Sequence, residues 1–360
     1  MPRGTELFPE IRELSEKIEK ATLPPELKSK ALQLVRQLDR MVKLRSYSSE
    51  YESISRYVAL VTSLPWNTRS RDNLDLKKAR EVLDKNHYGM ELVKERVLEY
   101  IAILNLTERE RGRRVEVATG PLAITRASVL CFVGLPGIGK TSVGYSIAQS
   151  LGRKFIRVAM GGMGTAAQLR GRARAFPMAE PGLIVKGLKK AQTKNPVVLL
   201  DEIDRVGEEA RAEVTGVLLE LLDPEQNSEF LDYYLDFPTD LSEALFICTA
   251  NHTRTIANAV LDRLEVIQMP AYSDEEKIVI GRDFLLPKSL EGAGLSSEQL
   301  VIAPDVWPQI ARPLGYDAGI RTLERTIQGI CRRVAKSVVE GKIKKVGISA
   351  ENIKDYLPRW

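Results

Sequence analysis

The chain has 360 residues, which at roughly 150 residues per domain is enough for two to three domains. A total of 53 Lys and Arg against 48 Asp and Glu leaves a net charge of +5, and 44% of the residues are hydrophobic. This composition is that of a folded protein and excludes both disorder along the whole chain and a disulfide-stapled mini-protein. A charge of +5 over this length does not indicate nucleic acid binding, which needs a clustered basic face.

Cysteine and histidine are scarce. The three cysteines have no C-x-x-C spacing, and with two histidines they are too few for an ordinary structural zinc site. This usage favours a thiol-reducing, intracellular setting. The longest apolar runs, such as residues 129–133, are far shorter than the ~20 residues that a membrane span requires. The N-terminus also has no apolar signal core.

The first hundred residues have a helical pattern. Apolar residues recur every three or four positions from Leu7 to Ile18, and Pro24-Pro25 interrupts the repeat. Further runs begin near residues 32 and 48, and a fourth covers 79–104 with a break at 87–89. We expect these stripes to pack between helices, and we predict an N-terminal helical region over residues 1–106.

Residues 107–128 differ from what precedes them. A run of Glu and Arg at 108–114 leads into Gly120-Pro121 with few large apolar residues. We predict an exposed linker here, and the charge run is typical of a solvated surface. A specific anion-binding role is the alternative.

After residue 128 short apolar runs alternate with amphipathic helical patterns. Runs at 129–133, 155–158, 196–200 and 245–249 predict a parallel sheet covered by helices, an α/β domain over 129–271. From residue 273 onward the pattern is helical, which predicts an all-α lid domain over 272–360. The expected fold class is therefore an α/β P-loop domain with an N-terminal helical region and a C-terminal helical lid.

The strongest motif lies directly after the first predicted strand. It fits G-x-x-x-x-G-K-[ST], and a helical pattern starts near its end. The glycines allow backbone N–H groups to surround phosphate oxygens, and the helix N-terminus adds positive potential. Its residues are Gly134, Leu135, Pro136, Gly137, Ile138, Gly139, Lys140 and Thr141. We predict nucleotide binding, with Lys140 on the β and γ phosphates and Thr141 on Mg²⁺.

Polar residues follow two of the other predicted strands. Asp201 and Glu202 end the run 197–200, where Asp201 suits Mg²⁺ and Glu202 suits a base that polarises the attacking water. Alone, such a pair is more often a helix N-cap, but the P-loop favours the catalytic interpretation. Asn251 follows the next strand and could orient the same water. Arg263 and Arg321 stand where helices begin, and a lone arginine there is normally a surface residue.

The order of these features resembles the AAA+ ATPases, and several strings resemble Lon, the ATP-dependent serine protease, from about residue 41 to about 335. The Asp-Pro-Glu-Gln-Asn string and the Leu-Glu-Arg signature are the most specific of them. The strings are Pro65-Trp66, His87-Tyr88-Gly89, residues 221–228, Leu261-Asp262-Arg263, residues 285–288 and residues 319–325.

The resemblance implies a function for each matching position. Lys140, Thr141 and Asp201 bind phosphate and Mg²⁺, Glu202 acts on water, and Asn251 is the sensor-1 residue. A further set is implied by the same family: Arg263 as the arginine finger that reaches the neighbouring subunit's nucleotide, Arg321 as sensor 2 at the γ-phosphate, and His87, Tyr88 and Gly89 as the segment against adenine.

In this family six modules form a ring that pulls unfolded polypeptide through a central pore into protease chambers. The implied cofactors are ATP or ADP and Mg²⁺, the implied partners are damaged or unfolded polypeptides and further copies of the chain, and the implied process is protein quality control. Membrane insertion is not expected and nucleic acid is not an expected partner. An AAA+ nucleic-acid motor and a nucleotide-bound scaffold without turnover are the alternatives.

Two pore loops depart from the family pattern. Phe176-Pro177 stands where the first pore loop carries Tyr followed by Val or Ile, so Phe176 retains an aromatic group while Pro177 removes an N–H and stiffens the backbone. A loop that merely packs Phe176 is the alternative. The second pore loop, which usually contains Gly-Asp-Pro, reads Ala212-Glu213-Val214, so its shape stays open.

The sequence ends before the position of the family's Ser-Lys protease domain, and no Gly-x-Ser-x-Gly string or Ser-His-Asp set replaces it. We therefore expect a fragment of a longer protease that hydrolyses ATP and moves polypeptide without cleaving it. The stretch 162–171 and the insertion before residue 128 look most like the peroxisomal Lon of filamentous fungi. This implies the peroxisomal matrix, with the mitochondrial matrix as the alternative.

Overall fold

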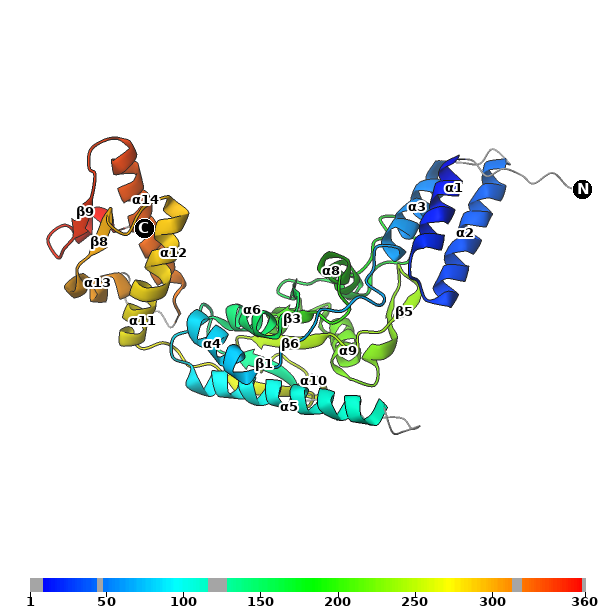
Figure 1. The fold of residues 1–360 in the computed structure, drawn as a ribbon, viewed down its shortest axis with the longest axis horizontal. Helices are drawn as coiled ribbons and strands as arrows, with labels where there is room; N and C mark the ends of the chain where they lie inside the picture. The colour runs from blue at the N-terminus through cyan, green and yellow to red at the C-terminus, as the bar shows by residue number, and fades with distance from the viewer. Residues whose placement is uncertain (1–8, 44–47, 116–127, 313–318, 358–360) are drawn as a thin grey trace, which may run out of the picture.

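Three bodies follow one another along the chain, and Figure 1 shows them in a row: a helical bundle, a sheet domain and a mainly helical lid. The computed structural model describes residues 9–43, 48–115, 128–312 and 319–357. The bundle consists of α1 (Pro9–Lys20), α2 (Pro25–Lys43) and α3 (Ser48–Val61). The apolar residues predicted to pack between helices do so, which confirms the helical pattern. Its buried core includes Ile11, Leu14, Ile18, Val35, Leu38 and Val58.

The central domain is built on a five-stranded parallel sheet of order β2-β3-β6-β1-β7. Its strands are β1 (Val129–Val133), β2 (Phe155–Ala159), β3 (Val197–Asp201), β6 (Leu245–Ala250) and β7 (Leu264–Gln268). The parallel sheet and its first four strands are confirmed. Strand β7 was not predicted, because Glu265 and Gln268 leave only two consecutive apolar residues between them.

Short elements and helices connect these strands. The helices are α6 (Lys140–Leu151), α7 (Ala167–Arg170), α8 (Leu183–Ala191), α9 (Arg211–Leu222) and α10 (Asn258–Leu261), with 3₁₀ turns at Ile203–Arg205 and Asn227–Glu229. Strands β4 (Phe230–Asp232) and β5 (Phe237–Thr239) form a separate antiparallel pair.

Helices α4 (Leu76–Asn86) and α5 (Glu91–Val115) pack on the sheet domain and not on the bundle. Their buried residues, such as Leu83 and Val97, share one core with Leu130 and Leu199 of the sheet. The predicted boundary at residue 106 is therefore wrong, because it lies inside α5, and α4 and α5 belong to the sheet domain.

The predicted linker is also wrong over residues 107–115, because α5 continues to Val115. Glu and Arg are strong helix formers, so a charge run can extend a helix that is already anchored by apolar residues. Residues 116–127 of that prediction lie outside the described residues.

The lid consists of α11 (Asp274–Ile280), a π-helical turn (Gly281–Leu285), α12 (Leu286–Ala293), a 3₁₀ turn (Pro304–Val306), α13 (Trp307–Ala311), α14 (Arg321–Val339) and α15 (Ile353–Tyr356). The predicted helical lid is confirmed, and it also contains a parallel pair of strands, β8 (Leu300–Ile302) and β9 (Val346–Ile348). Three-residue strands are too short to leave an alternation pattern. None of the helices within the described ranges has the length and apolarity needed to cross a membrane.

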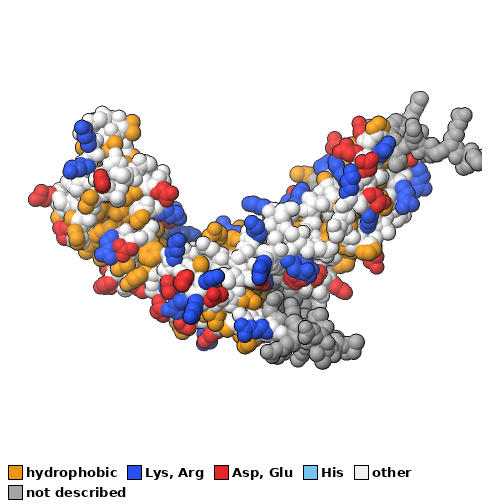
Figure 2. Space-filling model, viewed as in Figure 1, with side chains coloured by type: hydrophobic (Ala, Val, Ile, Leu, Met, Phe, Trp, Pro, Cys, Tyr) orange, Lys and Arg blue, Asp and Glu red, His pale blue; other side chains and the backbone are white. Residues whose placement is uncertain are grey.

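Parallel topology brings the carboxyl ends of the strands to one edge of the sheet. The P-loop follows β1, Asp201 is the last residue of β3, and Asn251 follows β6, which lies between them. On the surface drawn in Figure 2, basic and acidic side chains are interspersed over all three bodies. The candidate site is therefore sought at the carboxyl ends of the strands, where these residues meet.

Candidate functional site

The P-loop is a turn between β1 and α6 that depends on its glycines. Gly137 and Gly139 have φ values of +85° and +97°, a region that side chains other than glycine rarely adopt. A Cβ added to Gly134 would lie 2.6 Å from the carbonyl oxygen of Met269. Gly139 is also the N-cap of α6, and it offers no side chain to the first N–H groups of this 12-residue helix. These N–H groups are suited to bind an anion.

Lys140 lies inside this turn. Its Nζ donates to the carbonyl oxygens of Gly134 at 2.6 Å and Leu135 at 3.0 Å, and to Oδ1 of Asn251 at 3.1 Å. Burial lowers the pKa of Lys140, and the nearby carboxylates of Asp204 and Asp201 partly oppose that effect. The ammonium of Lys140 is thus held inside the P-loop by oxygens that carry no charge.

Asp201 is a buried carboxylate that accepts hydrogen bonds from three side chains. Thr249 Oγ1 donates to its Oδ1 at 2.5 Å and Thr141 Oγ1 at 3.2 Å. Arg157 contacts its Oδ2 through Nε at 2.7 Å and Nη2 at 2.6 Å. Thr141 and Asp201, which are both predicted to hold Mg²⁺, are thus in contact with each other, and metal binding stays a prediction.

Sequence reasoning missed Arg157 and Thr249. Both had a signal: each is a polar residue within an apolar strand pattern, two residues before the strand's end in β2 and one before it in β6. Such residues near the carboxyl end of a parallel strand lie beside the site.

Glu202 begins the turn that follows β3. Its φ of +60° is unusual for a residue with a side chain, and its N–H donates to Oγ1 of Thr249 at 2.9 Å. Its carboxylate lies 3.4 Å from Nη1 of Arg205 and is about one third exposed. Glu202 and Asp201 therefore have different partners, since Glu202 lies beside Arg205 while Asp201 contacts Thr141, Thr249 and Arg157.

Asn251 connects the lysine to a second buried acid. While its Oδ1 accepts from Lys140, its Nδ2 donates to Oδ2 of Asp204 at 3.3 Å. These two contacts fix which way the amide faces. Asp204 is 5% exposed, and the other oxygen of its carboxylate has no hydrogen-bond partner among the described residues.

The lid docks directly on the P-loop. The backbone N–H of Ile320 donates to the carbonyl oxygen of Gly137 at 3.0 Å, and Gly319 packs so closely that an added Cβ would lie 2.7 Å from the carbonyl oxygen of Pro136. Arg321 is the first residue of α14, and its side chain packs beside Gly137. The predicted sensor residue of the lid is thus at the phosphate-binding loop.

The turn between α4 and α5 contacts both α6 and the lid. His87 is buried, and its Nε2 is 2.9 Å from Oγ of Ser146. Tyr88 is 40% exposed and packs against Phe284 of the lid, with ring centroids 6.5 Å apart. Gly89 has φ of +65°, in the left-handed region. The predicted adenine segment therefore lies between α6 and the lid, and adenine contact stays a prediction.

Arg263 lies at the end of the sheet where the strands begin, opposite the end that carries the P-loop. It precedes β7, and its carbonyl oxygen accepts from the N–H of Val129 at the start of β1. The five residues of β1 span about 16 Å, so the whole strand separates Arg263 from its own P-loop. Its guanidinium instead donates to Oδ2 of Asp223 at 3.1 Å, in the Asp-Pro-Glu-Gln-Asn string. Arg263 therefore cannot serve the nucleotide site of its own chain.

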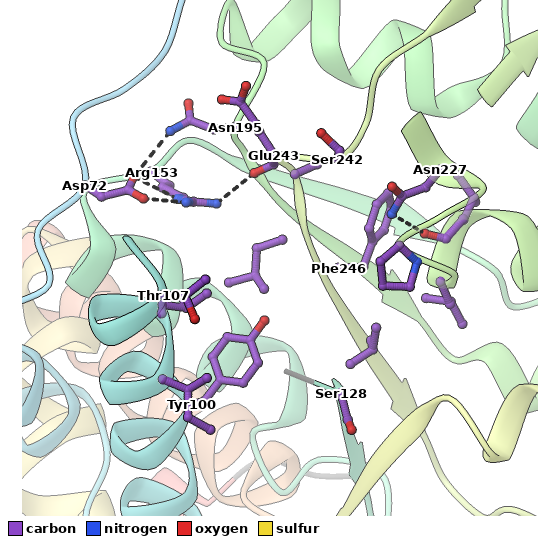
Figure 3. Close-up of a pocket in the computed structure, with 18 of the residues that line it drawn as sticks. Asp72, Tyr100, Thr107, Ser128, Arg153, Asn195, Asn227, Ser242, Glu243 and Phe246 are labelled. Carbon is purple, nitrogen blue, oxygen red and sulfur yellow. Dashed lines mark hydrogen bonds and ion pairs between the residues drawn. The ribbon is translucent and has the colours of Figure 1, made fainter. Parts of the chain in front are cut away.

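A cavity of about 660 Å³ lies at that same end of the sheet, and Figure 3 shows it. Its polar end is a closed network in which Arg153 pairs with Asp72 and donates to the carbonyl oxygen of Glu243, while Asn195 donates to Asp72. Apolar residues such as Tyr100 and Phe246 line the rest. Because Arg153 already pairs with Asp72, its charge is compensated within the cavity wall and it is not free to bind a phosphate.

The two pore-loop predictions have different outcomes. Phe176 is 59% exposed, and with Pro177 and Met178 it forms an apolar tip on the loop between α7 and α8. Sequence reasoning missed Met178, which is 89% exposed. Residues 212–214 do not form a loop, because they lie in the first turn of α9, where Val214 is buried.

The residues present fit a nucleotide with Mg²⁺. The uncapped N-terminus of α6 and the left-handed glycines leave backbone N–H groups for phosphate oxygens. Asp201 and Thr141 supply one carboxylate and one hydroxyl, the kind of set with which proteins hold Mg²⁺ together with substrate phosphates. Among the described side chains, only that of Lys140 donates a hydrogen bond to the carbonyl oxygens of residues 134 and 135.

The buried imidazole of His87 generates a pH prediction. Burial, with a smaller effect of the Lys94 ammonium, lowers the pKa of His87 to about 4. Between pH 6.5 and 4 the unfolded chain therefore binds a proton that the folded chain does not, and stability falls as the pH falls through this window. Replacing His87→Gln should make the wild-type slope shallower by up to about 1.4 kcal/mol per pH unit.

Urea unfolding at several pH values between 4.5 and 7 measures that slope. Gln149→Ala, which removes an exposed neutral side chain from α6, is the control and should keep the wild-type slope. An unchanged slope in His87→Gln would contradict a neutral, buried His87.

Comparison with known proteins agrees with this geometry. The family model of the ATPase family associated with various cellular activities (AAA) matches residues 130–271, and that of the Lon protease AAA+ ATPase lid domain matches residues 291–346. The chain is 44% identical over 349 residues to Lon protease of Dictyoglomus thermophilum, 42% over 359 residues to Lon protease 2 of Thermus thermophilus, and 41% over 348 residues to Lon protease 1 of Bacillus subtilis.

These alignments cover 97%, 99% and 97% of this chain but 42%, 44% and 43% of the relatives, so the chain spans less than half of their length. The two family models follow each other in the order of the sheet domain and the lid described above. The chain is an AAA+ ATPase module with a Lon-type lid, homologous to the ATPase region of the Lon proteases.

Proposed function

We propose that the chain binds nucleotide with Mg²⁺ between its sheet domain and its lid and hydrolyses ATP there. The observation that carries this proposal is convergence: Lys140, Asp201 and Asn251 come from three strand ends and meet at the P-loop. The lid backbone bonds to the same loop. The groups that would activate water and neutralise phosphate charge therefore lie at the same loop that the lid contacts.

Each side chain has a distinct task in hydrolysis. Lys140 and the N–H groups of the P-loop oppose phosphate charge, and Asp201 with Thr141 would hold Mg²⁺. Mg²⁺, when bound, neutralises charge on phosphate oxygens. Glu202 accepts a proton from water at its carboxylate and keeps that water oriented, while the amide of Asn251, fixed by Lys140 and Asp204, limits where the water can lie.

The variant Glu202→Gln tests the assignment. It removes the base but retains the shape and leaves Lys140 and Asp201 intact, so turnover of ATP should fall by about 10²- to 10⁴-fold while nucleotide affinity stays near that of wild type. Hydrolysis assays and binding of a fluorescent ADP analogue measure the two quantities.

Lys140→Ala is the matched comparison and should lose nucleotide binding. Loss of binding in Glu202→Gln would contradict the water-activating assignment. Turnover that persists in Glu202→Gln would exclude Glu202 as the base, and nucleotide binding without turnover in wild type would favour a scaffold. Salt-sensitive DNA binding would favour a nucleic-acid motor, which the interspersed surface charge of Figure 2 does not suggest.

We also propose that hydrolysis requires a ring, six-membered by its resemblance to the family, in which Arg263 serves the neighbouring nucleotide site. The support is topological: Arg263 is a full strand length from its own P-loop, yet its guanidinium is about one third exposed at the surface. A residue that cannot reach its own site can act only on another chain's site.

Mixing two inactive variants tests this ring. Glu202→Gln retains Arg263, and Arg263→Ala retains Glu202, so a mixed ring contains sites with both groups. We expect each variant alone to lack turnover and the mixture to recover part of it. Arg96→Ala, an exposed arginine on α5, is the control for loss of charge. No recovery in mixed rings of confirmed assembly would contradict action across subunits.

We propose further that the loop tip at Phe176 contacts unfolded polypeptide that the module translocates for protein quality control. Its support is the exposed apolar tip, since unfolded chains expose apolar side chains that such a tip can contact.

In the longer protein, Phe176→Ala should reduce degradation or unfolding of a tagged substrate several-fold and leave basal ATP turnover near wild type. Val339→Ala, at an 87% exposed position on the lid, is the control. Equal loss of basal turnover in Phe176→Ala would contradict a role confined to substrate.

Finally, we propose that the chain comes from a peroxisomal Lon, with the mitochondrial form as the alternative. The support is the loop over residues 162–171, which looks most like the peroxisomal form of filamentous fungi. Imaging the tagged longer protein against peroxisomal and mitochondrial markers tests the proposal, and mitochondrial co-localisation would overturn it.

A further inference from the structure

Arg157 holds a position that the hydrolysis scheme does not use. It is on β2, the edge strand beside β3, and the register pairs Arg157 with Leu199 and Ala159 with Asp201. Residues two apart on a strand face the same side, so Arg157 and Asp201 lie diagonally on one face of the sheet. The side chain of Arg157 needs only to run along the strand to reach the site.

The contact that it makes there is specific to one oxygen. Nε and Nη2 of Arg157 lie 2.7 Å and 2.6 Å from Oδ2 of Asp201, while Oδ1 accepts from the hydroxyls of Thr249 and Thr141. Both oxygens of the carboxylate are therefore engaged. A cation can bind Asp201 only by sharing or replacing one of these donors.

The two partners differ in how firmly they are held. The side chain of Asp201 is 4% exposed, and that of Arg157 is 53% exposed. Asp201 is fixed by the strand end and two threonines, whereas the guanidinium can leave toward water without opening the core. Of the four donors on Asp201, those of Arg157 are the ones that can be displaced at little cost.

Charge gives this contact a function. Asp201, Glu202 and Asp204 bring three carboxyl groups to the strand ends, and Lys140 is held among neutral oxygens. A buried carboxylate without a cation is unfavourable, and Arg157 supplies the charge that a metal ion would otherwise supply.

We propose that Arg157 is a positioning residue that competes with Mg²⁺ for Asp201 and thereby sets how much Mg²⁺ the nucleotide site needs. This inference rests on the proposed Mg²⁺-nucleotide function. Arg157 orients Asp201 through its two contacts to Oδ2, and a metal ion that binds this oxygen would have to displace them. Arginine suits this task because its planar fork makes two contacts to one carboxylate and its charge does not depend on pH.

The experiment is a Mg²⁺ titration at a fixed concentration of a fluorescent ADP analogue, and its readout is the Mg²⁺ concentration at half of the signal change. Arg157→Gln removes the competing cation, so the midpoint should move to a Mg²⁺ concentration about two- to fivefold lower, the scale of one partly exposed ion pair. Arg157→Lys keeps the charge but loses the fork, so its midpoint should lie between those of wild type and Arg157→Gln.

Arg96→Gln, which removes an exposed arginine paired with Glu99, is the matched control and should leave the midpoint unchanged. Thermal unfolding in EDTA shows whether each variant is folded, and the lysine variant carries the test if the glutamine variant is not. A midpoint that is unchanged or higher in a folded Arg157 variant would overturn the competition. Absence of any Mg²⁺-dependent signal in wild type would instead contradict the proposed function.

Discussion

The hydrogen bond from the N–H of Ile320 to the carbonyl oxygen of Gly137 joins the lid to the predicted phosphate-binding loop, and the placement of Arg321 at this loop depends on it. Gly137 can accept this bond because its left-handed φ turns the peptide outward, and Gly319 can approach because it has no Cβ. The loop that we propose to bind phosphate is therefore also the part of the sheet domain to which the lid is hydrogen-bonded.

Charge balance is the second constraint. Three carboxyl groups and Lys140 occupy the carboxyl edge of the sheet, where burial disfavours any uncompensated charge. The threonines at 141 and 249 supply neutral donors, Asn251 passes a hydrogen bond from Lys140 to Asp204, and Arg157 supplies a removable cation. In the structure the carboxylate of Asp201 is already paired with Arg157. Binding of phosphate and metal, as proposed, would replace this pair with new ones and would not add an unpaired charge.

Features that are encoded by neighbouring residues could be predicted from the sequence, and features that depend on how distant segments pair could not. The P-loop, the acids at 201 and 202, and Asn251 were predictable because each directly follows an apolar run, and parallel strands bring their ends together. Arg157 and Thr249 were not predicted, because their contact with Asp201 depends on how the strands pair in the sheet. The boundary in α5 was misplaced because a run of good helix formers looks like a linker unless the helix before it is anchored. The short strands of the lid carry too few residues for a periodic signal.

Hydrogen exchange with and without ATP analogue and Mg²⁺ tests the central claim most directly, because it compares the two edges of the sheet in one measurement. If nucleotide lies between the P-loop and the lid, amides of residues 134–143 and of Ile320 and Arg321 gain protection. Those lining the large cavity, around Arg153 and Glu243, should not change. Protection confined to that cavity, with no change at the P-loop or Ile320, would contradict the account.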